Sequence, residues 1–259
     1  MKKNQLSELR EFLDLKVAEF NTPAFIEHDP ISIPHLFTAK EDREISGFLI
    51  ATIAWGQRPT ILKNGLQLMK AMDYQPSDFI RHHSIAERKQ FAAFVHRTFN
   101  GTDCIYFIKA LQQLYRHHDG LEGSFSACFS NSNDLGKSIS EWKNKFFAFQ
   151  PETRTFKHFA DPLKNSSAKR ICMYLRWMVR KDNAGVDFGI WKKIPVSALC
   201  PPLDLHSGRV ARLLGLLERK QDDWKAVTEL RKKLLQLDPN DPVKYDFALY
   251  GLGIYEGFK

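Results

Sequence analysis

The sequence has few cysteines and none of the cysteine spacings that bind metals. Its 259 residues include four cysteines, and no two of them form a Cys-x-x-Cys pair. The spacings match no zinc or iron–sulfur ligand pattern, so we expect no metal and no cofactor. Scattered cysteines without a pairing pattern are typical of a protein from a reducing compartment.

Long hydrophobic runs are also missing. The first twenty residues, MKKNQLSELREFLDLKVAEF, carry charges throughout and lack the uninterrupted apolar core of a signal peptide. No other run approaches the roughly 20 apolar residues that cross a bilayer. We therefore expect a cytoplasmic monomer with no membrane partner, nucleoid-associated in a bacterium.

Signals for β-strands are scarce, and helical spacing of apolar residues is common. The only short alternation, Ile31-Ser32-Ile33, ends at a proline. The segment 21–41 contains three prolines and is predicted to be an extended connection. The fold class predicted is all-α. Helices are expected at 4–20, 42–54, 59–72, 86–97, 102–118, 134–148, about 166–180, 222–236 and 241–250.

The charge balance favours an anionic partner. The chain has 38 Lys and Arg residues against 30 Asp and Glu residues, a formal net charge of +8. Basic surface of this kind commonly neutralises phosphates. Arg58, Arg209 and Arg212 are candidates to contact a phosphate backbone, and each has the alternative of being an ordinary solvated charge.

Lys169 is the first candidate for chemistry. With a helix that Ser166 or Ser167 caps, Lys169 and Arg176 lie on one face, backed by apolar residues on the other sides. A partly desolvated lysine near a helix start can serve as an amine nucleophile. The alternative is a solvated lysine that contacts a phosphate.

Asp204 is the second candidate. It follows two prolines and precedes an amphipathic segment, in the run PPLDLHS. The structural role of such a residue is to cap the helix, and the catalytic role is to stabilise a developing sugar cation. The two roles are compatible, because backbone hydrogen bonds help to keep a carboxylate ionised. His206 is a candidate phosphate contact.

Three blocks together resemble the helix-hairpin-helix DNA glycosylases, which include endonuclease III and the 8-oxoguanine glycosylases. FLIATIAWGQ, which ends at Gln57, is similar to the family's helix that ends in a small residue and a DNA-probing glutamine. KNSSAKRICMYLRW lies where the hairpin and its following helix should be, and PLDLHSGRVARLLGL is similar to the block that holds the catalytic aspartate. The signatures LRWMVRKD, PLDLH and DPVKYDFAL resemble a bacterial branch of conserved hypothetical proteins.

The resemblance implies a two-lobed fold with DNA in a central cleft. Residues 42–185 would form a helical barrel with a hairpin-like element near 163–181, and residues 1–41 and 186–259 would form the second lobe. Lys169 and Asp204 would face each other across the seam as the catalytic pair. By the same resemblance, the residues that bind DNA would be Gln57, Arg58, Ser166, Ser167, Arg176, His206, Arg209 and Arg212.

The activity implied is base-excision repair on double-stranded DNA that contains a damaged purine such as 8-oxoguanine. Base flipping, a Schiff base on Lys169 and an oxocarbenium ion stabilised by Asp204 would make the enzyme a glycosylase with AP lyase activity. Two alternatives are a non-catalytic protein that binds DNA or recognises damage with the same fold, and a helical interaction protein without a nucleic-acid role.

The sequence departs from the family pattern at three points. Asn165-Ser166-Ser167 replaces the usual Gly-x-Gly of the hairpin. Lys169 and Asp204 are 204 − 169 = 35 residues apart, a longer separation than in endonuclease III, and the insertion resembles the archaeal 8-oxoguanine enzymes. The C-terminal iron–sulfur cysteines of endonuclease III are absent.

Overall fold

The chain is mostly helical, which confirms the predicted all-α class. The computed structural model describes residues 3–149 and 151–258. Within these ranges the only strands are β1 (Val95–His96) and β2 (Phe99–Asn100), which pair as an antiparallel hairpin. None of the helices in the described ranges combines the length and the apolar character needed to cross a bilayer.

Two compact units make up the molecule. Unit 1 joins the chain up to Glu27 to the chain from Asp161 onward, and unit 2 is the stretch His28–Ala160 between them. The predicted lobes differ in their limits, since residues 28–41 belong to unit 2 and residues 161–185 belong to unit 1. Both members of the expected catalytic pair therefore lie within unit 1, and they do not come from different lobes.

The core of unit 2 is built around α3, which is buried along most of its length. Phe48 of this helix packs its ring against four other aromatic rings, those of Phe107, Trp142, Phe146 and Phe159. Pairs of neighbouring helices such as α8 and α9 enclose this aromatic cluster. The helices of unit 2 are α3 (Lys40–Ile53), α4 (Arg58–Ala71), α5 (Pro76–His82), α6 (Ile85–Lys89), α7 (Gly101–His117), α8 (Gly120–Ser132) and α9 (Leu135–Phe146), with 3₁₀ turns η3 (Gln90–Ala93) and η4 (Thr153–His158).

The segment 21–41 is helical in part, which corrects the predicted extended connection. It contains α2 (Pro23–His28) and the 3₁₀ turns η1 (Pro30–Ser32) and η2 (Pro34–Leu36). Each of these begins with a proline, whose fixed φ suits the first position of a helix and whose missing N–H costs nothing there. The alternation at Ile31–Ile33 belongs to η1 and its end, and it forms no strand.

The predicted helix 86–97 is also corrected. Ser84 and Glu87 form a capping box that begins α6, but this helix ends at Lys89. The chain then forms η3 and the hairpin β1–β2. Arg97, in the hairpin turn, has a positive φ of 54°, which breaks any continuation of the helix.

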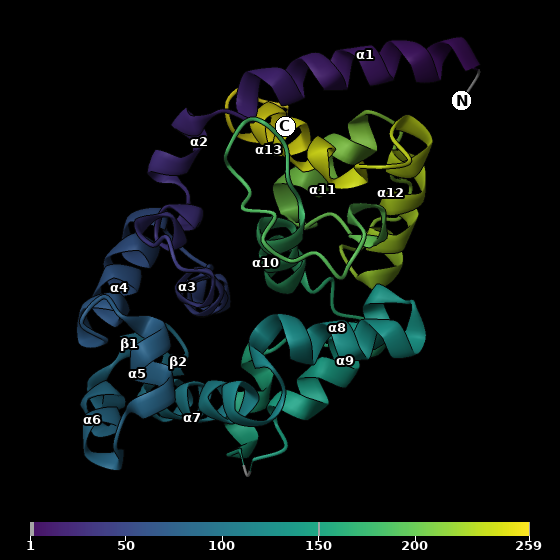
Figure 1. The fold of residues 1–259 in the computed structure, drawn as a ribbon. Helices are drawn as coiled ribbons and strands as arrows, with labels where there is room; N and C mark the ends of the chain where they lie inside the picture. The colour runs from purple at the N-terminus through teal and green to yellow at the C-terminus, as the bar shows by residue number, and fades with distance from the viewer. Residues whose placement is uncertain (1–2, 150, 259) are drawn as a thin grey trace. The chain divides into compact units, whose positions relative to one another are not determined.

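Unit 1 is organised around α13, which packs against both α1 and α11 (Figure 1). The closest approach is at Gly251, where an added Cβ would overlap the Phe20 ring at the end of α1. The elements of unit 1 are α1 (Lys3–Phe20), α10 (Lys169–Val179), α11 (Leu205–Leu213), α12 (Trp224–Leu237) and α13 (Tyr245–Ile254), with 3₁₀ turns η5 (Pro162–Lys164), η6 (Val196–Ala198) and η7 (Pro242–Lys244).

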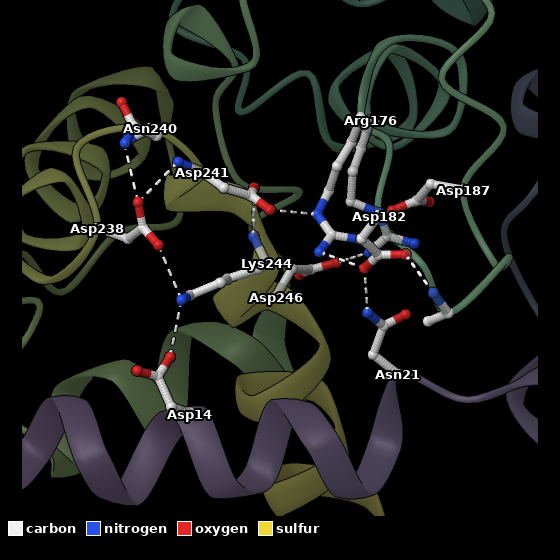
Figure 2. A network of polar contacts seen from close by, with 12 residues as sticks. Asp14, Asn21, Arg176, Asp182, Asp187, Asp238, Asn240, Asp241, Lys244 and Asp246 are labelled. Carbon is white, nitrogen blue, oxygen red and sulfur yellow. Dashed lines mark hydrogen bonds and ion pairs between the residues drawn. The ribbon is translucent and has the colours of Figure 1, made fainter.

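A network of ion pairs ties α1 and α10 to the segment that begins α13 (Figure 2). Lys244 contacts Asp14 of α1 at 2.9 Å and Asp238 at 2.8 Å. Asn21, just after α1, donates to Asp182 at 2.5 Å. These contacts explain why the first helix belongs with the last third of the chain.

We expect Gly251→Ala to destabilise unit 1 by about 1–3 kcal/mol, because the Phe20 ring has to move to admit a methyl group. Gly253→Ala is the matched control on the same helix, since its Cβ would meet its nearest neighbour, a Val210 methyl, at 3.3 Å. Urea unfolding of both variants measures the difference. Equal stabilities would show that α1 and α13 are not in tight contact at Gly251.

Candidate active site

Lys169 is the first residue of α10. The helix begins one or two residues later than a cap at Ser166 or Ser167 would place it, and Ala168 occupies the cap position with a left-handed φ of 49°. The Ser166 hydroxyl accepts a hydrogen bond from the Ala168 N–H at 3.2 Å, so it orders the turn before the helix. Neither serine is the N-cap, because the left-handed turn at Ala168 separates both from the first helical residue.

Asp204 caps α11, as its sequence position predicted. Its Oδ1 accepts hydrogen bonds from the backbone N–H groups of His206 and Ser207, both at 2.9 Å. The Ser207 hydroxyl in turn accepts the Asp204 N–H at 2.9 Å, which completes a capping box. The two prolines before Leu203 are buried and stiffen the approach to this cap.

Lys169 and Asp204 are in direct contact. The Lys169 Nζ lies 2.6 Å from Asp204 Oδ2, the oxygen that the helix cap leaves available. The Lys169 side chain is 38% exposed and the Asp204 side chain 19% exposed, so the pair is open to solvent on one side. An amine and a carboxylate at this distance can exchange a proton directly.

The carboxyl group of Asp204 is held in its ionised form. Burial by itself would raise its pKa, but the charge and hydrogen bond of Lys169, with the hydrogen bonds of Ser207, lower the pKa below its ordinary value. At neutral pH the site therefore presents a carboxylate to the positive end of α11 and to the Lys169 amine.

The turn before α10 is fixed by one acid, Asp223. Asn165, at a left-handed φ of 63°, donates from Nδ2 to Asp223 Oδ2 at 2.9 Å, and Ser166 forms an isolated β-bridge with the same residue. Arg219 forms an ion pair with Asp223, which also caps α12. This acid was not predicted, because its partners lie four and about 58 residues away in the sequence.

A family model described as "Protein of unknown function (DUF2400)" matches residues 29–255, most of the chain. The chain belongs to the DUF2400 family. No match was found among curated proteins or among solved structures.

The other predicted DNA-binding residues of this DUF2400 chain fall into two groups. His206 and Arg209 are exposed on the first turns of α11, directly after Asp204. Arg212 is half-buried and is held by Asp222 at 2.5 Å and by the carbonyl oxygen of Arg219.

Arg176 leaves the set of proposed DNA contacts. Its side chain is 3% exposed and pairs with Asp187, 3.2 Å away, and with Asp246 of α13. Arg180, one turn further along the chain, is 2% exposed and forms ion pairs with Asp182, Asp187 and Asp241. The part of α10 that carries Arg176 therefore faces the interior of unit 1, where carboxylates from other segments contact it.

Gln57 and Arg58 belong to unit 2, at the turn that begins α4. Gln57 is exposed and makes no side-chain cap hydrogen bond to the helix. An unpredicted cation lies beside this turn: a Cβ on Gly56 would be 2.8 Å from Nη1 of Arg97. Arg154 donates to the carbonyl oxygen of Thr98 at 3.0 Å, which adds a second arginine to the hairpin.

The cysteines do not supply an alternative nucleophile. All four are buried, and none of them forms a disulfide. Burial raises the pKa of Cys172, the one on α10, well above its ordinary value, which keeps it a thiol. Within the described part of the chain, no group of three or more His, Cys, Asp or Glu side chains is arranged to hold a metal ion.

We expect Asp204→Ala to lower the free energy of unfolding by about 1–2 kcal/mol at neutral pH, because it removes a helix cap. Asp204→Asn keeps an acceptor for the cap and should cost about half as much. Because the folded-state pKa of Asp204 is lowered, its charge stabilises the protein above about pH 4, and this stabilisation is lost as the pH falls through the folded pKa.

Urea unfolding of wild type and Asp204→Asn between pH 7 and pH 3.5 tests this expectation. The stability difference between the two proteins should narrow towards acid pH. If the stability difference between wild type and Asp204→Asn stays constant with pH, the ionised carboxylate adds nothing to stability. If Asp204→Asn and Asp204→Ala lose the same stability, the loss does not come from the helix cap.

Proposed function

We propose that this protein is a base-excision DNA glycosylase with AP lyase activity, acting on a damaged purine such as 8-oxoguanine in double-stranded DNA. The observation that carries the proposal is the contact between the Lys169 amine and the Asp204 carboxylate at the starts of two helices. The resemblance of three sequence blocks to the helix-hairpin-helix glycosylases selects this reaction from those that such a pair can perform.

The proposed reaction begins with a nucleotide flipped out of the duplex, because its C1′ is not accessible within the base stack. Lys169 gives a proton to Asp204 and its nitrogen attacks C1′. The bond from C1′ to the base breaks, and Asp204 passes the proton to the departing base, which leaves Asp204 as a carboxylate again. The Asp204 carboxylate stabilises the positive charge that develops on the sugar.

The lyase half follows from the same covalent bond. The sugar ring opens to a Schiff base between C1′ and the Lys169 nitrogen. Loss of a proton from C2′ then expels the 3′ phosphate by breaking its bond to C3′, and water hydrolyses the Schiff base to release the enzyme. The Asp204 carboxylate is the nearest described base for this proton.

Each unit, taken by itself, exposes side chains that suit a phosphate backbone. His206 and Arg209 are exposed on the first turns of α11, beside Asp204. In unit 2, Arg97 lies against the turn that carries Gln57, and its exposed guanidinium has no carboxylate partner among the described residues. Exposed arginines of this kind are used to neutralise phosphates in DNA complexes.

The first test is trapping with borohydride, which reduces a Schiff base to a stable amine. Wild type should form a covalent complex with a duplex that contains 8-oxoguanine or an abasic site. Lys169→Gln should form none, and Asp204→Asn should form it roughly 10²–10³-fold more slowly because the positive charge loses its counterion. Denaturing gel electrophoresis measures the complex.

Lys164→Gln is the matched control, since Lys164 is an exposed lysine five residues before Lys169. It should trap as well as wild type. Trapping that survives in Lys169→Gln would place the nucleophile elsewhere. Tight binding of the duplex without trapping on any lesion or abasic site would favour the non-catalytic DNA-binding alternative.

The second test concerns the surface of unit 2. We expect Arg97→Gln to weaken binding to duplex DNA roughly three- to tenfold at low salt and to reduce the slope of log affinity against log salt by about one, because one phosphate contact is lost. Fluorescence anisotropy over a salt series measures both quantities. Lys137→Gln removes an exposed cation from α9 of the same unit and should change neither; equal effects would mean that only net charge matters.

A further inference from the structure

Asp246 is a buried acid of α13 that the proposed reaction does not yet use. It forms an ion pair with Nη1 of Arg176. The carboxylate of Asp187 contacts Nε of the same arginine (Figure 2). Burial raises the pKa of Asp246 to about 6, although Arg176 opposes the rise. The carboxyl group is therefore able to change its charge in the range where enzymes of this kind work.

The charged groups that face Asp246 include both members of the candidate pair. The charged groups are Lys169 and Arg176 from α10, Asp187 from the loop that follows it, and Asp204 from the start of α11, and the neutral thiol of Cys172 on α10 also faces Asp246. Lys169 favours the ionised form of Asp246, whereas Asp204 and Asp187 disfavour it. The influence is mutual, because each charge acts on the other with the same energy.

The backbone explains why these groups are coupled. Arg176 follows Lys169 by seven residues, two turns on the same face of α10, or about 10 Å along the axis. Asp246 lies on α13, which packs along α11, and Asp204 is the cap of α11. The Arg176–Asp246 ion pair thus joins α10, which carries Lys169, to α13. Because α13 packs along α11, the ion pair also links α10 to the helix that Asp204 caps.

We propose that Asp246 is a positioning residue for the Lys169–Asp204 pair, acting through Arg176 to hold α10 against α13 and α11 and adding a negative charge that favours positive charge on the bound sugar. Its kinetic role rests on the proposed glycosylase function. The electrostatic coupling within the site does not, and it can be measured without a substrate.

The direction of the kinetic effect follows from the sign of the charge. The sugar gains positive charge in the transition state, and an ionised Asp246 lowers the energy of that charge through the protein interior. Protonation removes this contribution. The rate of the covalent step should therefore rise with pH through about 6, and Asp246→Asn, a neutral residue of the same shape, should behave like the protonated enzyme at every pH.

The test of the coupling is a carboxyl ¹³C titration of the free protein, with the Asp204 and Asp246 resonances assigned through bonds in isotope-labelled wild type. In wild type the Asp246 resonance should titrate near pH 6, and the Asp204 resonance should shift at the same pH. In Asp246→Asn the shift of the Asp204 resonance near pH 6 should vanish. An Asp204 resonance that does not move near pH 6 in wild type overturns the inference, and that measurement does not require any variant to fold stably.

Asp241→Asn is the matched control. Asp241 is half-buried and, like Asp246, is bound to a buried arginine. Its partner is Arg180, which directly follows α10 and is four residues further from Lys169 than Arg176. This variant should keep the Asp204 shift near pH 6. Loss of the shift in both variants would mean that any damage to the network has the same effect, and it would overturn the specific role of Asp246.

The kinetic test is single-turnover trapping between pH 5 and pH 8. Asp246→Asn should match wild type at pH 5 and be roughly three- to tenfold slower at pH 8, with unchanged affinity for a duplex that contains an uncleavable abasic analogue. Asp241→Asn should keep the wild-type profile. Equal wild-type and Asp246→Asn profiles overturn the kinetic role. If wild type shows the carboxyl coupling but traps no substrate, the proposed function fails and the kinetic role with it, while the coupling stands.

Discussion

Two buried arginines, one on α10 and one directly after it, are the constraint on which unit 1 depends. A guanidinium cannot lose its proton, and removing it from water is costly unless carboxylates replace the lost hydrogen bonds. Arg176 and Arg180 are 3% and 2% exposed, so their partners have to come from other parts of the chain. Those partners lie in the loop after α10 and in the segment that begins α13, which the network draws together (Figure 2).

Such a network contributes more to orientation than to net stability. Replacing a buried ion pair by apolar residues is often neutral, whereas a planar guanidinium with several carboxylates accepts few arrangements. Arg176 is held from two sides, by Asp187 and by Asp246. The rotation of α10 about its axis is thereby fixed, and with it the direction in which Lys169 projects towards Asp204.

Helices with one clear apolar face could be predicted from the sequence, and the others could not. α1, α3, α7 and α12 were located to within a few residues because their apolar residues repeat at helical spacing. α8 was missed because its sequence, GLEGSFSACFSNS, is rich in glycine and serine, which favour a helix little, and has few large apolar residues to mark a face. The two-residue strands of the hairpin are too short to carry an alternation.

The residues of the candidate site also differ in how far the sequence could predict them. Local signals, a basic helix start and a capping acid, made Lys169 and Asp204 candidates, and the family resemblance made them a catalytic pair; the structure places the two side chains in contact. Arg176 was assigned to the DNA surface because helical spacing shows which residues share a face and not what that face meets. Arg176 is buried against Asp246, which lies 70 residues away in the sequence, and no local sequence pattern connects the two residues.

The change in exposure along α10 limits where chemistry can occur. Lys169 and Arg176 share one face, but the first is 38% exposed and the second is buried. A substrate can therefore reach only the N-terminal end of this face, where Asp204 also leaves one oxygen outside its helix cap. Charges further along the helix act on that end through the protein interior. They are therefore screened less than charges that interact through salt solution. The same buried network can therefore both fix the position of the amine and set the electrostatic potential around it.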